Sequence, residues 1–127
     1  MDAPITGDTY SFERTFTHED VEQFAEVSQD TQARHTEPDD DGRLMVHGLL
    51  TATLPTKIGG DLDVLAASMN FEFRRPVYTG DRINCVCTVE SIEERSDRYD
   101  LTIDTVCRNA DETVVLTATI DGHILKE

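Results

Sequence analysis

The chain has 127 residues, 38% of them hydrophobic, so it is long enough for one domain with its own core and too short for a second. Its formal net charge is −15, from 26 acidic and 11 basic residues, which argues against binding nucleic acid through counterion release. No apolar run is long enough to span a bilayer, and the first residues lack the basic start and apolar core of a signal peptide.

The cysteines and the acidic residues suggest where the protein works. Three cysteines without a paired framework are typical of a reducing compartment, so a cytoplasmic location is expected. Cys85 and Cys87 share one face of a strand and are interpreted as core thiols, because no second Cys/His cluster completes a metal site. Neither a metal nor a cofactor is predicted. The acids are spread along the chain and only two basic residues are lysines, which favours an origin in a salt-loving organism.

The first third of the chain predicts a strand, a helix and a loop. Residues 10–16 alternate aromatic with polar side chains, as a half-buried strand does. Thr17 and Asp20 resemble a capping box at the start of a helix that should end near Ser28. Residues 29–43 are rich in Asp, Gln, Thr and Pro and are interpreted as a loop.

The apolar stretch over residues 45–54 predicts a buried central helix, because it has almost no polar face. His47 and Gly48 stand where a capping residue is usual, so the first N–H groups are open to an anion or an oxyanion. Pro55 should bend or break this helix. The two glycines of a loop over residues 59–63 should end it.

The second half of the chain predicts four strands. Apolar and polar residues alternate around residues 69–73, 83–89, 99–105 and 114–120. Short connections between the last three strands require antiparallel pairing. The order of one strand, two helices and four strands predicts an α+β fold, with a curved antiparallel five-stranded sheet wrapped around the central buried helix. Residues 1–127 are expected to form this single domain.

Three segments together resemble the MaoC-like hot-dog family. Residues 24–35 are similar to its hydratase signature, in which a helix ends in an aspartate, here Asp30, and a histidine, here His35, follows five residues later. Residues 46–50 look like the start of the family's central helix, and residues 73–81 are similar to its Pro-x-x-x-Gly-Asp turn. The resemblance implies a hot-dog fold, an (R)-specific enoyl-CoA hydratase or related acyl dehydratase, and at least a homodimer with sites near the interface.

The resemblance also implies residue roles in the hydration of a trans-2-enoyl thioester to the (R)-3-hydroxyacyl thioester, or in the reverse dehydration. Asp30 would take a proton from a water that His35 orients, or His35 would return a proton to the α-carbon. The Gly48 N–H would receive the charge that develops on the thioester oxygen. Thr56 stands where relatives carry a serine near the active centre and has at most a supporting role.

Three further residues are assigned to substrate binding. Arg74 and Arg75 are either a solvated strand end or the basic patch that the phosphates of coenzyme A would need on so acidic a protein. His47 is interpreted as a packing residue at the helix start rather than a second base. Asp30 or His35 alone is more often an idle surface residue, and only the joint match favours the catalytic pair.

The sequence departs from the family pattern in two places. Gln32-Ala33 replaces the usual Asn-Pro between the aspartate and the histidine, and the stretch between His35 and His47 is shorter than in many relatives. Two alternatives to the hydratase therefore stay open. One is an acyl-CoA thioesterase on the same fold, which the Asp-x4-His spacing disfavours. The other is a non-catalytic acyl-binding subunit that pairs with an active homologue.

Overall fold

The computed structural model describes residues 3–127, where five strands and four helices follow one another along the chain. None of these helices is long and apolar enough to cross a membrane. The strands are β1 (Thr9–Thr15), β2 (Leu65–Phe73), β3 (Arg82–Glu94), β4 (Arg98–Arg108) and β5 (Val114–Leu125). The helices are α1 (His18–Ser28), α2 (Ala33–Thr36), α3 (Gly48–Thr51) and α4 (Thr53–Asp61).

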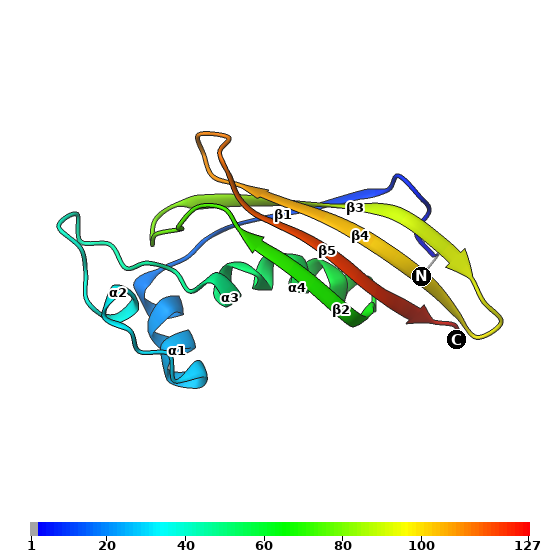
Figure 1. Ribbon diagram of the computed structural model, residues 1–127, viewed down its shortest axis with the longest axis horizontal. Coiled ribbons are helices and arrows are strands. Elements are labelled where there is room, and N and C mark those ends of the chain that lie inside the picture. The colour runs from blue at the N-terminus through cyan, green and yellow to red at the C-terminus, as the bar shows by residue number, and fades with distance from the viewer. Residues whose placement is uncertain (1–2) are drawn as a thin grey trace.

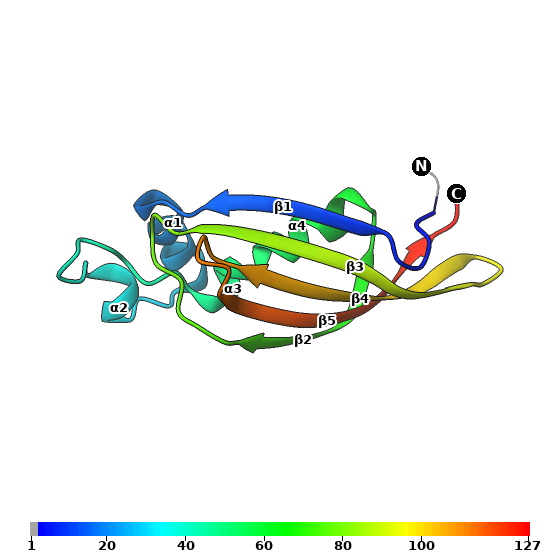
Figure 2. The same ribbon diagram turned by 90° about the horizontal axis from the view of Figure 1, so that it is seen from above.

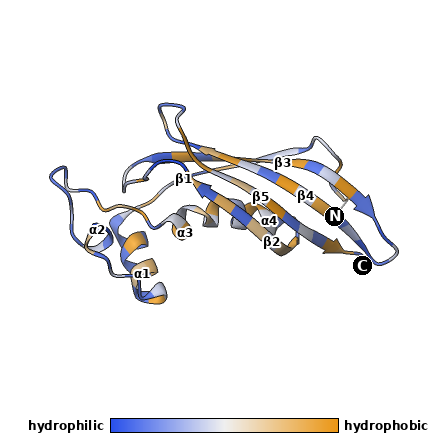
Figure 3. Ribbon diagram, in the orientation of Figure 1, coloured by the Kyte–Doolittle hydropathy of each residue, from blue (hydrophilic) through white to orange (hydrophobic). Residues whose placement is uncertain are grey.

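The five strands form one antiparallel sheet in the order β1-β3-β4-β5-β2, which Figure 2 shows from above. The hairpins β3-β4 and β4-β5 confirm the antiparallel pairing expected from their short connections. Buried residues alternate with more exposed ones along β4, and the hydropathy of the strands alternates in the same way (Figure 3). One face of the sheet is therefore the core face.

The sheet curves over α3 and α4, which lie against its concave side (Figure 1). Leu54 of α4 and the strand residues Ile83 and Leu116 are fully buried where the two layers meet. Cys85 and Cys87 are buried free thiols in the same core, as interpreted from the sequence. The predicted α+β architecture, a five-stranded antiparallel sheet wrapped around a central helix, is confirmed.

The central helix is broken at Ala52, three residues before the proline that was expected to bend it. Pro55 has no N–H to bond to the carbonyl of Thr51, and its ring crowds that carbonyl. The bend therefore falls one turn before the proline, at the junction of α3 and α4.

Two expectations for this helix were wrong. It runs through both glycines to Asp61, because Ile58 and Leu62, four residues apart on the buried face, hold its last turn against the core. It is also not buried on every side, since Leu49 is 62% exposed and the outer face of α4 is open in this chain.

Residues 29–43 are not wholly a loop, because α2 lies within them. The predicted capping box of α1 is present, with Thr17 and Asp20 exchanging side-chain and main-chain hydrogen bonds, and α1 ends at Ser28 as expected. Helices α1 and α2 sit together at one end of the sheet, beside the start of α3 (Figure 1). This end of the molecule holds the residues singled out from the sequence.

Candidate active site

A cavity of about 840 Å³ lies between α1, α2, the start of α3 and the residues that follow β2. Six of the seven residues predicted for the site line it, namely Asp30, His35, His47, Gly48, Arg74 and Arg75. Thr56 does not. Its hydroxyl donates to the Ala52 carbonyl at 3.0 Å, and it borders a separate cavity of about 190 Å³ between α4 and the sheet.

Asp30 follows α1 directly, at a turn that Gln29 makes with a left-handed φ of 62°. Its Oδ1 accepts hydrogen bonds from the side-chain amide of Gln32 at 3.0 Å and from the Gln32 main-chain N–H at 3.4 Å. The hydrogen bond from the Gln32 side chain is the main reason why the pKa of Asp30 lies below its ordinary value. The carboxylate is thus held in its charged form, with Oδ2 left for other partners.

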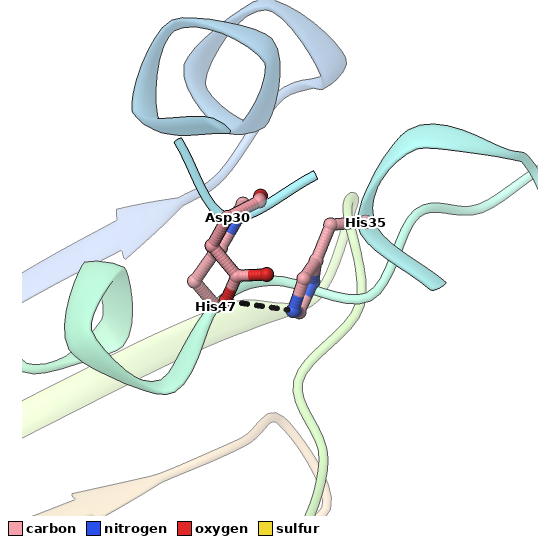
Figure 4. A group of neighbouring side chains, drawn as sticks. All are labelled: Asp30, His35 and His47. Carbon is pink, nitrogen blue, oxygen red and sulfur yellow. Dashed lines mark hydrogen bonds and ion pairs between the residues drawn. The ribbon is translucent and has the colours of Figure 1, made fainter. Parts of the chain in front are cut away.

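His35 lies on α2, and its ring is buried beside the Asp30 carboxylate (Figure 4). Its Nδ1 is 2.7 Å from the Met45 carbonyl oxygen, and because a carbonyl only accepts, Nδ1 carries the proton. The other nitrogen, Nε2, faces Asp30 Oδ2 at 3.8 Å. That distance is too long for a direct hydrogen bond, but one water oxygen at about 2.8 Å from each atom can bridge it.

The departure at Gln32-Ala33 does not separate this pair. Gln32 carries the same amide group as the asparagine of the family pattern, and that amide bonds to the aspartate. Ala33 is the first residue of α2, the position where proline is favoured and where alanine fits equally well. The side-chain amide that Gln32 shares with asparagine was the feature of the sequence that could have indicated that Gln32 replaces it.

His47 packs between Phe24 and His35. Its ring stacks on that of His35, with centroids 3.8 Å apart and planes 17° from parallel, and its centroid is 4.8 Å from that of Phe24. Asp30, His35 and His47 each offer a ligand atom within 4.8 Å of the others. Imidazole binds a metal in the plane of its ring, however, and nearly parallel stacked rings do not aim their lone pairs at one point. The geometry favours a stacked pair over a metal centre.

Gly48 begins α3, and the ring of Phe73 lies against its Cα. A Cβ built on Gly48 would lie 2.7 Å from Phe73 Cε1, so any larger residue here would require the half-exposed Phe73 ring to move. Its N–H donates to no other group among the described residues and stands at the positive end of the helix. The helix α3 alone is one turn long, so this positive end is weaker than an unbroken helix would provide.

Most, but not all, of the basic side chains form ion pairs. Within residues 3–127, eight of the eleven basic side chains form ion pairs with carboxylates, those of Arg14, Arg43, Lys57, Arg74, Arg82, Arg95, Arg98 and Lys126. Of the three others, Arg34 and Arg75 line the cavity. Arg34 was missed in the sequence analysis, although its place beside His35 was a usable signal.

Residues 4–118 match a family model described as the FAS1-like dehydratase domain region. The chain belongs to this family. It is 31% identical over 125 residues to the mitochondrial 3-hydroxyacyl-[acyl-carrier-protein] dehydratase of Arabidopsis thaliana, a match that covers 92% of this chain and 73% of the relative. This protein is therefore a hydratase or dehydratase of the hot-dog class, which agrees with the resemblance noted in the sequence.

Solved structures confirm the fold of this FAS1-like dehydratase domain. The (R)-hydratase of A. caviae involved in PHA biosynthesis superimposes with a TM-score of 0.84 at 21% identity, over 99% of this chain and 100% of that one. R-hydratase PhaJ1 of Pseudomonas aeruginosa gives a TM-score of 0.84 at 18% identity, over 96% of this chain and 83% of the other. At such identities the likeness establishes the hot-dog fold.

Proposed function

We propose that this FAS1-like dehydratase domain hydrates trans-2-enoyl thioesters to (R)-3-hydroxyacyl thioesters, or catalyses the reverse dehydration. The observation that carries the proposal is the pair Asp30 Oδ2 and His35 Nε2, which face each other 3.8 Å apart in the cavity. The gap suits one water, and the two flanking groups are the residue types that move protons near neutral pH.

In the hydration direction, the water gives one O–H hydrogen bond to Asp30 Oδ2 and the other to His35 Nε2. Asp30 takes the first proton while the oxygen adds to the β-carbon, and electron density moves through the α-carbon to the thioester oxygen. The Gly48 N–H stabilises that oxygen. Neutral His35 has its proton on Nδ1, so it orients the water, and protonated Asp30 returns its proton to the α-carbon.

The charge distribution supports an anionic carrier on the substrate. Arg34 and Arg75 line the cavity without a carboxylate partner among the described residues, whereas Arg74 is paired with Glu72 at 3.3 Å. We assign the phosphates of coenzyme A to Arg34 and Arg75, with Arg74 as a weaker contributor. Thr56 contacts the substrate only if the acyl chain reaches the smaller apolar cavity beside α4.

We further infer that the protein acts as a homodimer or higher homo-oligomer at high salt. Strand β2 is an edge strand whose residues are almost all exposed, and it carries Leu65, Met69 and Phe73 at 55%, 41% and 55% exposure. An apolar open edge of this kind pairs readily with a second copy. The net charge of −15 is the basis for the expected salt adaptation.

The deciding assay follows the loss of enoyl thioester absorbance when purified protein is mixed with crotonyl-CoA. Asp30→Asn and His35→Ala should each lower turnover by about 10²-fold or more, the usual worth of a positioned proton-transfer group. Asp97→Asn, which removes an acid in the distant β3–β4 turn, is the matched control and should leave turnover unchanged. Asp30→Asn and Asp97→Asn should nearly keep the native melting temperature, whereas His35→Ala should lower it, because it removes a buried ring and its hydrogen bond to the Met45 carbonyl.

Three outcomes distinguish the alternatives. Near-normal turnover in Asp30→Asn or His35→Ala would rule out the mechanism above. Release of free coenzyme A by the native protein would favour the thioesterase. Complete inactivity that is restored by an active homologue would favour the non-catalytic subunit, an arrangement that the facing pair of Asp30 and His35 disfavours.

A further inference from the structure

His47 is a buried histidine with one unexplained nitrogen. The residue is 3% exposed, and within residues 3–127 its Nδ1 is the one fully buried side-chain nitrogen or oxygen that lacks a hydrogen-bond partner. Buried polar atoms are nearly always paired, so an orphan of this kind calls for a reason. The hydrogen bond made by the other nitrogen of the ring provides it.

The Nε2 of His47 lies 3.0 Å from the main-chain carbonyl oxygen of Asp30. A carbonyl oxygen only accepts, so Nε2 carries the proton and Nδ1 is left as an acceptor. The opposite tautomer would set two acceptors against each other at Asp30 and would place an N–H donor in the buried space without an acceptor. The orphan Nδ1 is thus the consequence of keeping the Nε2–H bond to Asp30.

This bond is the long-range tether of the segment that carries the proposed base. The other hydrogen bonds of Asp30 go to Ser28 and Gln32, each two residues away. They shape the turn but do not fix it in the molecule. The bond from His47 spans 17 residues and joins the turn to the residue that directly precedes Gly48. The same ring stacks on His35, so His47 contacts both members of the pair.

We propose that His47 is a positioning residue, which holds the Asp30 turn in register with His35 and Gly48 through its Nε2–H bond to the Asp30 carbonyl. This inference rests on the proposed hydratase function and assigns His47 no contact with the substrate. A displacement of about 1 Å in a reacting group can cost about 10²-fold in rate, so a tether on the main chain of the base acts on kcat rather than on KM.

Two amide substitutions of His47 test the hydrogen bond to the Asp30 carbonyl separately from the loss of the imidazole ring. In His47→Gln the amide nitrogen takes the place of Nε2 and still reaches the Asp30 carbonyl, whereas in His47→Asn it takes the place of Nδ1 and falls short. Both variants lose the ring stack. His47→Asn should lower kcat by about 10- to 100-fold with KM nearly constant, and His47→Gln should recover most of that loss. Equal kcat values in the two variants would overturn the proposal.

A double-mutant cycle tests whether His47 acts through Asp30. In the Asp30→Asn background the carboxylate is already gone, so adding His47→Asn should change the residual rate little. If His47→Asn lowered that residual rate by the same factor as in the native protein, His47 would act independently of Asp30 and the proposal would be wrong. A general packing defect would also give the same factor in both backgrounds.

A spectroscopic measurement on the native protein does not depend on whether the variants fold. Nitrogen-15 NMR of the histidine rings should show His47 with its proton on Nε2 and a bare Nδ1. The Nδ1–H tautomer would overturn the tether outright. If the native protein bound no enoyl thioester and hydrated none, the proposed function and the positioning role would both fail. An active native protein with equally impaired His47 variants would refute the positioning role alone.

Discussion

The two oxygens of the Asp30 carboxylate make different contacts. Oδ1 is tied to the Gln32 side chain and main chain, while Oδ2 points across the gap to His35 Nε2. His35 is similarly divided, with Nδ1 tied to the Met45 carbonyl and Nε2 left free. In each residue one polar atom therefore makes the hydrogen bonds that orient the side chain, and the other faces the cavity. A bridging water requires this arrangement.

Removal of the Gln32 amide should raise the pKa of Asp30, because its hydrogen bond is the main cause that lowers it. In Gln32→Ala the Asp30 carboxylate should accept its proton at a higher pH than in the native protein. Gln32→Asn, which keeps an amide, is the matched control. A carbon-13 NMR titration of the Asp30 carboxyl between about pH 2 and pH 6 measures the shift, since the unperturbed value is about 3.9.

The sign of this effect carries over to activity and stability. A carboxyl whose pKa is lower in the folded state adds stability above its unfolded pKa, and that contribution is lost as the pH falls through the folded pKa. At neutral pH, Gln32→Ala should thus lose part of the stability that the charged Asp30 carboxylate contributes. The fall of its hydration rate on the acidic side should occur at a higher pH than in the native protein. An Asp30 pKa equal in Gln32→Ala and the native protein would show that the amide does not hold the charge.

At the residue scale, the sequence predicted the pair of Asp30 and His35 but not the hydrogen bonds that hold this pair in place. Asp30 and His35 were found through their spacing in a family signature. The Met45 carbonyl that fixes His35 and the Asp30 carbonyl that holds His47 were not predictable, because main-chain acceptors carry no mark in the sequence and both bonds are long-range. Arg34 stands beside His35 in the sequence, but its lack of an ion pair with the carboxylates of residues 3–127 could be seen only in the structure.

At the scale of elements, the most accurate expectations rested on local chemistry. The capping box of α1 depends on Thr17 and Asp20 alone, and its predicted position was confirmed. The extent of α4 was wrong because tertiary burial of Ile58 and Leu62 outweighs the cost of two glycines, each about 1 kcal/mol. The helix α2 was missed because four residues give too short a pattern for periodicity to be read.

The capping box gives a prediction for stability. Thr17→Ala removes the hydroxyl that accepts the Asp20 N–H, and it should lower the free energy of unfolding by about 1 kcal/mol. Thr17→Ser keeps the acceptor and is the control. Urea unfolding at constant salt measures the change, with the slope of the transition unaltered. An unchanged unfolding midpoint in Thr17→Ala would mean that the exposed cap contributes nothing to this fold.

At the scale of the whole molecule, β2 is the weakly enclosed edge. Among the described residues, 3–127, it pairs only with β5, and Met69 at its centre is 41% exposed. We expect Met69→Lys to dissociate the proposed dimer, because a charge on an edge strand opposes pairing with a second copy. Val27→Lys is the matched control, since Val27 is 84% exposed on α1 and lies away from this edge.

Light scattering at micromolar concentration and high salt measures the result. The native protein and Val27→Lys should both have at least twice the mass of one chain, and Met69→Lys should have the mass of one chain. A native monomer under these conditions would contradict the proposed assembly. An oligomer that survives Met69→Lys would place the interface elsewhere.

The acidic surface gives the last prediction, which concerns salt. A net charge of −15 creates repulsion that opposes folding, association and the approach of an anionic substrate. Crowding of acids also appears locally, where a side-chain hydrogen bond with Asp104, and after it repulsion between the two carboxyl groups, raises the pKa of the neighbouring Glu90 above its ordinary value. Salt also weakens attraction between arginines and phosphates. Within residues 3–127, however, eight of the eleven basic residues are already paired with carboxylates, so there is less attraction to lose.

Potassium chloride should therefore raise both the melting temperature and the hydration rate as its concentration increases from about 0.1 M to about 1 M, over which the screening length falls from roughly 10 Å to roughly 3 Å. Choline chloride is the control, because screening depends on ionic strength and not on the identity of the cation. A rise with potassium alone would indicate bound ions in place of screening. A protein equally stable and active across the whole range would show that the acidic surface has no part in salt adaptation.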